Sequence, residues 1–210
     1  MRAPDVIATD KLGKVLTDLI RTYQPKTILE IGSSDGRGST SVIYKEARKY
    51  PCKMYCIEMN RERFADLEKL FGMNEWMELF CGSSVDHTWM IPTSIIKELH
   101  KDHPEFNVWN ELGLDYMIKW HEQTVTNINN ADHCFKLLPV DFAFVDGSPF
   151  TGYAEADLIY GTKIIVLDDV MDLKCFFAYN QLKESSHYKL IDEDLTFRNG
   201  YAVFSYVERI

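Results

Sequence analysis

The stretch that decides the fold is Thr27–Thr40, whose sequence is TILEIGSSDGRGST. A short apolar run, Thr27–Ile31, contains one acid, Glu30, and gives way to a loop with three glycines. A segment suited to a helix then begins at Ser39. This order is typical of a buried parallel strand that leads into the N-terminus of a helix, where backbone N–H groups bind ligands. The sequence therefore predicts an α/β fold with a ligand site at the end of this strand.

The acid in this motif indicates what kind of ligand binds there. A phosphate-binding loop surrounds its ligand with backbone N–H groups and has little use for a carboxylate at the strand tip. Glu30 instead suits a ligand with a cationic end and a ribose, and S-adenosylmethionine has both. Loop glycines let the backbone turn sharply and pass close to a ligand. The predicted cofactor contacts in this stretch are Glu30, Gly32, Ser33, Gly36 and Ser39.

Bulk properties limit the domain count and the partners. The chain has 210 residues, of which 46% are hydrophobic and 26% charged, a balance typical of one globular α/β domain over 1–210. The N-terminus lacks an apolar signal core, so we expect a cytoplasmic protein with no membrane partner. A net charge of −9 disfavours nucleic acid, which needs a basic surface. A small-molecule acceptor is the expected partner, and a homodimer is left open.

Helical and strand patterns alternate along most of the chain, which predicts a mostly parallel sheet with helices on both faces. Helices are expected over 10–23, from 39 to before Pro51, after the cap residue Asn60, and over 173–183. Strands are expected over 27–31, 53–57, 77–80, 140–146, 163–167, 188–191 and 201–207. No helix fits between the last two strands, so we expect them to pair as an antiparallel hairpin.

The regular alternation stops between about 85 and 138. This segment favours helices near 92–99 and 112–128 and shows no convincing strand. A structureless loop of this length is uncommon, so the sequence predicts a helical insert or lid after the third strand. Its aromatic residues either form a local core or line an acceptor pocket, and these residues are Trp89, Phe106, Trp109, Tyr116 and Trp120.

Polar residues gather at the predicted carboxyl ends of several strands, the edge where open α/β sheets bind ligands. Glu58 ends the second strand, about twenty residues past the glycine loop, where a carboxylate can accept both ribose hydroxyls. Ser83 and Ser84 follow the third strand and are either adenine contacts or ordinary turn serines. The sequence thus adds Glu58, Ser83 and Ser84 to the predicted cofactor site.

A second cluster is expected where the fourth and fifth strands end, at Asp146, Asp168 and Asp169. Adjacent carboxylates can converge on one hard cation, which would lower the pKa of a substrate hydroxyl. The alternative is that the aspartates cap strand-to-helix turns. Asp146 is also the candidate catalytic residue, as a general base or an amine-binding carboxylate.

Several of these motifs resemble class I S-adenosylmethionine-dependent methyltransferases, and in particular the small O-methyltransferases of the catechol and caffeoyl-coenzyme A type. The matching segments are KLGKVL from Lys11, ILEIGSSDGRGS from Ile28, YCIE from Tyr55, FAFVDG from Phe142 and IIVLDDV from Ile164. The resemblance implies a Rossmann-like seven-stranded sheet with an antiparallel last strand. It also implies O-methylation of a small molecule, with Asp146, Asp168 and Asp169 at the magnesium positions of metal-dependent members.

The chain departs from that group in one respect that bears on mechanism. Metal-dependent members usually carry a lysine base a few residues after the fourth-strand acid, but Asp146 is followed by Gly147-Ser148-Pro149-Phe150. The sequence therefore leaves the base unidentified, with His87 and His121 as further candidates. Two alternatives stay open, an NAD-dependent oxidoreductase on the same fold and a non-catalytic nucleoside-binding module.

Overall fold

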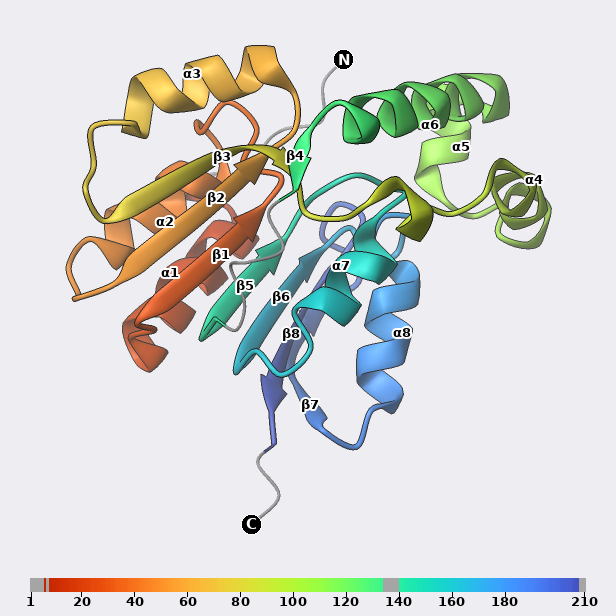
Figure 1. Ribbon diagram of the computed structural model, residues 1–210. Helices are drawn as coiled ribbons and strands as arrows, with labels where there is room; N and C mark the ends of the chain where they lie inside the picture. The colour runs from red at the N-terminus through yellow and green to blue at the C-terminus, as the bar shows by residue number, and fades with distance from the viewer. Residues whose placement is uncertain (1–5, 7, 134–139, 208–210) are drawn as a thin grey trace.

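The computed structural model describes residues 6, 8–133 and 140–207 (Figure 1). Its centre is an eight-stranded sheet with the order β4-β3-β2-β1-β5-β6-β8-β7. The strands are β1 (Thr27–Ile31), β2 (Lys53–Glu58), β3 (Met77–Ser83), β4 (Asp132–His133), β5 (Phe142–Val145), β6 (Ile164–Asp168), β7 (Tyr188–Asp194) and β8 (Tyr201–Tyr206). Strands β1 to β6 pair in parallel, whereas β8 is antiparallel to both β6 and β7. The predicted seven strands with an antiparallel last strand are confirmed, and the two-residue β4 extends the edge beside β3.

Helices occupy both faces of the sheet and one of its ends. They are α1 (Lys11–Tyr23), α2 (Ser39–Ala47), α3 (Arg61–Phe71), α4 (Thr93–Asp102), α5 (Asn107–Leu112), α6 (Leu114–Asn129), α7 (Gly152–Leu158) and α8 (Phe176–Glu184), with a short 3-10 helix η1 (His87–Trp89). Helix α3 begins at the predicted cap, because the Asn60 side chain accepts hydrogen bonds from the backbone N–H groups of Glu62 and Arg63. None of the described helices is both long and apolar enough to cross a membrane.

The alternation of side chains along the strands separates two cores. Ile28 of β1 packs with α1, α2 and α3 on one face, whereas Leu29 and Ile31 pack with α7 and α8 on the other. Figure 1 shows α7 and α8 on the viewer's side of the sheet and α1 and α2 behind it. Because side chains alternate with a period of two, Glu30 points to the same face as Ile28, toward α2.

The helices of the 85–138 segment stand over the carboxyl ends of the parallel strands (Figure 1). They share a third core that includes Ile96 of α4, Trp109 of α5 and Met117 of α6. The same core takes in Phe150 and Leu173, which lie in the loops after β5 and β6. Burial of these two loop residues fixes α4, α5 and α6 next to the edge where the predicted site residues lie.

Candidate active site

The glycine loop after β1 is wedged between the ends of β2 and β5. The backbone N–H groups of Gly32 and Ser33 both donate to the carbonyl of Ile57, each at 3.0 Å. Gly32 has φ +90°, and a Cβ there would lie 2.2 Å from the carbonyl oxygen of Asp146. Only glycine tolerates both this conformation and this close approach. The loop is therefore held rigidly, with Gly36 bonded back to the Ser33 carbonyl at 3.1 Å.

Glu30 lies beneath this loop and has no exposed surface. Its carboxylate accepts hydrogen bonds from the hydroxyls of Ser39 and Thr40, both at 2.6 Å. Burial raises the pKa of Glu30, and these hydroxyl donors partly offset that rise. Glu30 thus joins the end of β1 to the first turn of α2 and supports the loop from below.

Glu58 lies beside the loop at the end of β2 and is 7% exposed. Its Oε2 accepts a hydrogen bond from the Ser34 N–H at 2.7 Å, and its Oε1 accepts one from the Asn60 N–H at 2.6 Å. Burial raises the pKa of Glu58, against the opposing effect of these backbone donors. Each carboxylate oxygen bonded once still has a lone pair for a ligand hydroxyl. The structure therefore places the acid next to the loop, as a ribose site requires.

The two predicted serines after β3 have different partners. Ser83 donates to the carbonyl of Val85 at 2.7 Å and closes a local turn. Ser84 donates to Glu155 Oε1 of α7 at 2.7 Å, and Thr151 donates to the same oxygen at 2.9 Å. Ser84 therefore connects the β3 end of the site with the α7 side.

Glu155 itself is a buried acid that the sequence did not single out. It is 2% exposed, and its carboxylate packs against Gly147, the residue after Asp146. Its Oε2 has no hydrogen-bond partner among the described residues. Burial raises the pKa of Glu155 to about 7, so this acid titrates near neutral pH. In the sequence its spacing resembles that of any helical glutamate, so no local signal marks it.

The three predicted aspartates converge at the ends of β5 and β6. Asp146, Asp168 and Asp169 each bring one carboxylate oxygen within 4.8 Å of the others. Asp169 adopts φ +56°, a left-handed conformation that is uncommon for a residue other than glycine. Burial, together with the charges of Asp146 and Asp169, raises the pKa of Asp168 well above its usual range. The cluster has the residue types of a divalent metal site.

A lysine that the sequence analysis missed stands within this cluster. Lys174 Nζ lies 2.5 Å from Asp146 Oδ1 and 2.5 Å from Asp169 Oδ2. Burial acts to lower the pKa of Lys174, but the aspartate charges outweigh it and raise the pKa well above its usual range. The ammonium is therefore charged, and two of the three carboxylates that a metal would use are already bonded to it.

The position of Lys174 in the chain explains why it was missed. The family resemblance implies a lysine just after Asp146, whereas Lys174 follows Asp169 by five residues, in the turn between β6 and α8. Adjacent parallel strands bring their carboxyl ends together, so the loop after β6 had the same access to the cluster. A lysine in the loop after β6 was therefore as good a candidate as one in the loop after β5.

The two candidate histidines, His87 and His121, lie in η1 and α6, within the segment over the sheet. His121 is buried in α6, and its Nε2 donates to the Ile91 carbonyl at 2.7 Å, so it stabilises the helices over the sheet.

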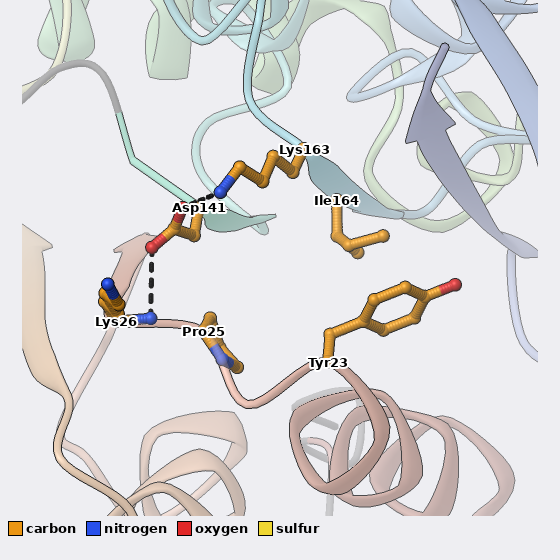
Figure 2. A pocket seen from close by; sticks show the side chains of 6 residues that line it. All are labelled: Tyr23, Pro25, Lys26, Asp141, Lys163 and Ile164. Atoms are coloured by element: carbon orange, nitrogen blue, oxygen red, sulfur yellow. Dashed lines mark hydrogen bonds and ion pairs between the residues drawn. The ribbon is translucent and has the colours of Figure 1, made fainter. Parts of the chain in front are cut away.

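A hollow of about 150 Å³ lies at the opposite edge of the sheet, at the amino ends of the strands (Figure 2). There Asp141 accepts hydrogen bonds from the Lys26 N–H at 3.0 Å and Lys163 Nζ at 2.8 Å. These contacts tie together the starts of β1, β5 and β6.

Comparison with solved structures shows the same fold in known methyltransferases. An O-methyltransferase from Bacillus cereus in complex with S-adenosylhomocysteine matches with a TM-score of 0.62 and 15% identity, over 98% of this chain and 84% of that one. TomG from Streptomyces achromogenes, an O-methyltransferase of tomaymycin synthesis solved with S-adenosylmethionine, matches at 0.59 and 17%, over 98% and 83%. S-adenosylhomocysteine-bound PaMTH1 from Podospora anserina matches at 0.58 and 15%, over 94% and 78%.

No protein-family model and no curated protein sequence matches the chain. At these identities the structural matches establish the fold alone, a Rossmann-like fold that the chain shares with these methyltransferases. The resemblance to the O-methyltransferase group noted in the sequence is thereby confirmed at the level of architecture.

Proposed function

We propose that this chain transfers a methyl group from S-adenosylmethionine to an oxygen atom of a small-molecule acceptor. The observation that carries the proposal is Glu58, held against the glycine loop by the Ser34 N–H at 2.7 Å. This carboxylate stands at the ligand edge of a fold whose solved examples include proteins with S-adenosylmethionine or S-adenosylhomocysteine bound. A carboxylate beside a glycine loop is suited to the two hydroxyls of a ribose.

The remaining cofactor contacts divide between direct and supporting roles. Glu58 accepts the ribose hydroxyls, while the loop backbone at Gly32, Ser33 and Gly36 passes close to the methionine part. Glu30 acts through the loop, since its carboxylate is buried and bonded to Ser39 and Thr40. Ser83 and Ser84, at the end of β3, lie on the side of the site assigned to adenine.

The chemistry requires alignment and removal of one proton. The acceptor oxygen attacks the methyl carbon in line with the carbon–sulfur bond, whose electron pair returns to sulfur and leaves S-adenosylhomocysteine. The proton of the acceptor hydroxyl passes to the Asp146 carboxylate, which lies at the end of β5. No step passes through magnesium, because an ammonium already stands among the carboxylates that would bind it.

The acceptor side of the site is assigned to the helices over the sheet. Trp120 of α6 is 38% exposed and packs edge-on against Phe150, with ring centroids 5.6 Å apart. Phe150 follows Asp146 by four residues, so Trp120 stands near the loop that carries the proposed catalytic carboxylate. An apolar wall of this kind favours a small acceptor with an aromatic or aliphatic body. Helices α4, α5 and α6 thus serve as the lid of the acceptor pocket.

Thermal denaturation with two ligands tests the class of activity. We expect S-adenosylhomocysteine at saturating concentration to raise the unfolding temperature and NAD to leave it unchanged. Stabilisation by NAD alone would overturn the proposal in favour of an oxidoreductase. Transfer of a labelled methyl group to any member of a hydroxylated acceptor panel would then separate an enzyme from a nucleoside-binding module.

A further inference from the structure

The carboxylates at the ends of β5 and β6 already hold a cation that belongs to the chain. Lys174 Nζ lies 2.5 Å from one oxygen of Asp146 and 2.5 Å from one oxygen of Asp169. The Lys174 side chain is only 17% exposed, so these ion pairs are largely withdrawn from water. Charge-assisted bonds with such short distances are stronger in this setting than on an open surface.

The backbone around Lys174 is held in place by its neighbours, so the side chain starts from a fixed position beside the aspartates. Its neighbours Leu173 and Cys175 are buried at 2% and 0% exposure. The Lys174 carbonyl packs directly on Gly152 of α7, where a Cβ would lie 1.9 Å from the carbonyl oxygen. Asp172 also anchors the turn, because it accepts a hydrogen bond from the Val108 N–H of α5 at 3.0 Å. The turn therefore holds the Lys174 backbone in a fixed position at the site.

A divalent metal does not fit the cluster while Lys174 stands there. Magnesium needs six oxygen ligands at about 2.1 Å in near-octahedral geometry. Two of the three available carboxylates, Asp146 and Asp169, already point an oxygen at Lys174 Nζ. A metal bound to the same oxygens would lie within a few ångströms of the ammonium and would be strongly repelled by it.

We propose that the ammonium of Lys174 takes the place of a divalent cation among Asp146, Asp168 and Asp169, so that the site works without a metal. An ammonium has three N–H donors, and the described residues engage two of them. The third is available to the acceptor oxygen, which it holds and whose developing negative charge it stabilises. This last role rests on the proposed methyl transfer, whereas replacement of the metal does not.

Binding of Mn²⁺ to the full chain, measured by electron paramagnetic resonance, tests whether Lys174 replaces the metal. The measurement requires no catalytic turnover. The wild type and a distant lysine variant, K69A, are expected to bind Mn²⁺ equally weakly. K174A removes the positive charge and opens the space, so we expect Mn²⁺ to bind roughly tenfold more tightly or better. D146N introduced into K174A should abolish that gain, which would place the new site among the three carboxylates. Mg²⁺ should compete for it.

Two results would overturn the proposal. One is tight Mn²⁺ binding by the wild type that D146N removes, and the other is a folded K174A that gains no binding. If circular dichroism shows that K174A is unfolded, Mn²⁺ binding by the wild type is compared with that by D146N. Equally weak binding by these two proteins supports the proposal that the Lys174 ammonium occupies the cation position. S-adenosylhomocysteine binding, measured on the same samples, reports on the proposed function separately. Once an acceptor is known, turnover should survive a chelator.

Discussion

Along the carboxyl edge of the sheet, the half formed by β1 and β2 differs from the half formed by β5 and β6 in what its carboxylates bind. In the first half the donors are neutral, because Glu30 accepts from two hydroxyls and Glu58 from two backbone N–H groups. In the second half Asp146 and Asp169 bind the ammonium of Lys174.

This difference indicates different roles for the two halves. Neutral donors orient a carboxylate without cancelling its charge, so the first half remains attractive to a ligand with hydroxyls and a positive sulfonium. The ammonium balances part of the charge in the second half and supplies a donor there. Under the proposed function, the same residue types therefore serve the cofactor in one half and, in the other, an acceptor oxygen that becomes negative.

Gly32→Ala should produce the largest effect, because Gly32 is the point where the two halves meet. The new Cβ would lie 2.2 Å from the Asp146 carbonyl oxygen, at a residue with φ +90°. We expect the free energy of unfolding to fall by about 3 kcal/mol or more, measured by urea denaturation.

Gly161→Ala is the matched control for that variant. Gly161 has φ +96°, but a Cβ there meets nothing within 4 Å. The free energy of unfolding of this variant should fall by about 1 kcal/mol, from backbone strain alone. Equal losses for the two variants would show that the β1 loop is not wedged against β5.

Glu155→Gln tests the buried acid between the halves through its pH dependence. Burial raises the pKa of Glu155 to about 7 in the folded chain, above its ordinary value near 4.5. The unfolded chain then releases the proton first, so the stability of the wild type falls as pH rises from about 4.5 to 7. Urea denaturation at pH 8 should find Glu155→Gln more stable by up to about 3 kcal/mol, with no such gain at pH 4.

Glu98→Gln, on the exposed surface of α4, is the control for this pH profile. It should follow the wild type at every pH. A Glu155→Gln profile parallel to that of the wild type would mean that Glu155 does not carry the titration.

Thr40→Val should have a smaller effect confined to the first half. It keeps the shape of the side chain but removes the hydroxyl that donates to Glu30 at 2.6 Å. Loss of a buried hydrogen bond to a carboxylate should lower the free energy of unfolding by about 2 kcal/mol.

Thr17→Val, which removes a hydroxyl bonded to a helix carbonyl in α1, should cost less than about 1 kcal/mol. If the two threonine variants are equally stable, Glu30 does not depend on its hydroxyl donors and the role assigned to it is wrong.

The sequence predicted most of the fold because the strands carry strong local signals. Buried runs such as Ile164–Leu167 and the change of period after Ile31 indicated where strands lie along the chain and at which edge of the sheet polar residues gather. The elements it missed are short. Strand β4 has two residues, and α5 and α7 have six and seven, lengths at which packing rather than local pattern decides the structure.

Site residues that directly follow a strand could be predicted from the sequence. Site residues in a turn or a helix were harder to predict. Glu58 and Asp146 end strands, and the topology alone brings them to one edge. Lys174 lies in the loop after β6, which the topology also brings to that edge. Glu155 reaches the edge only because α7 packs against the β6–α8 turn at Gly152. Such contacts depend on tertiary packing, which no spacing in the chain reveals.

The most direct test of the central claim is calorimetric titration of S-adenosylhomocysteine into the wild type and Glu58→Ala. The account predicts that the variant remains folded and binds roughly 100-fold more weakly, because two charge-assisted hydrogen bonds to the ribose are lost. An affinity unchanged by the substitution would contradict the assignment of the β1–β2 half to the nucleoside.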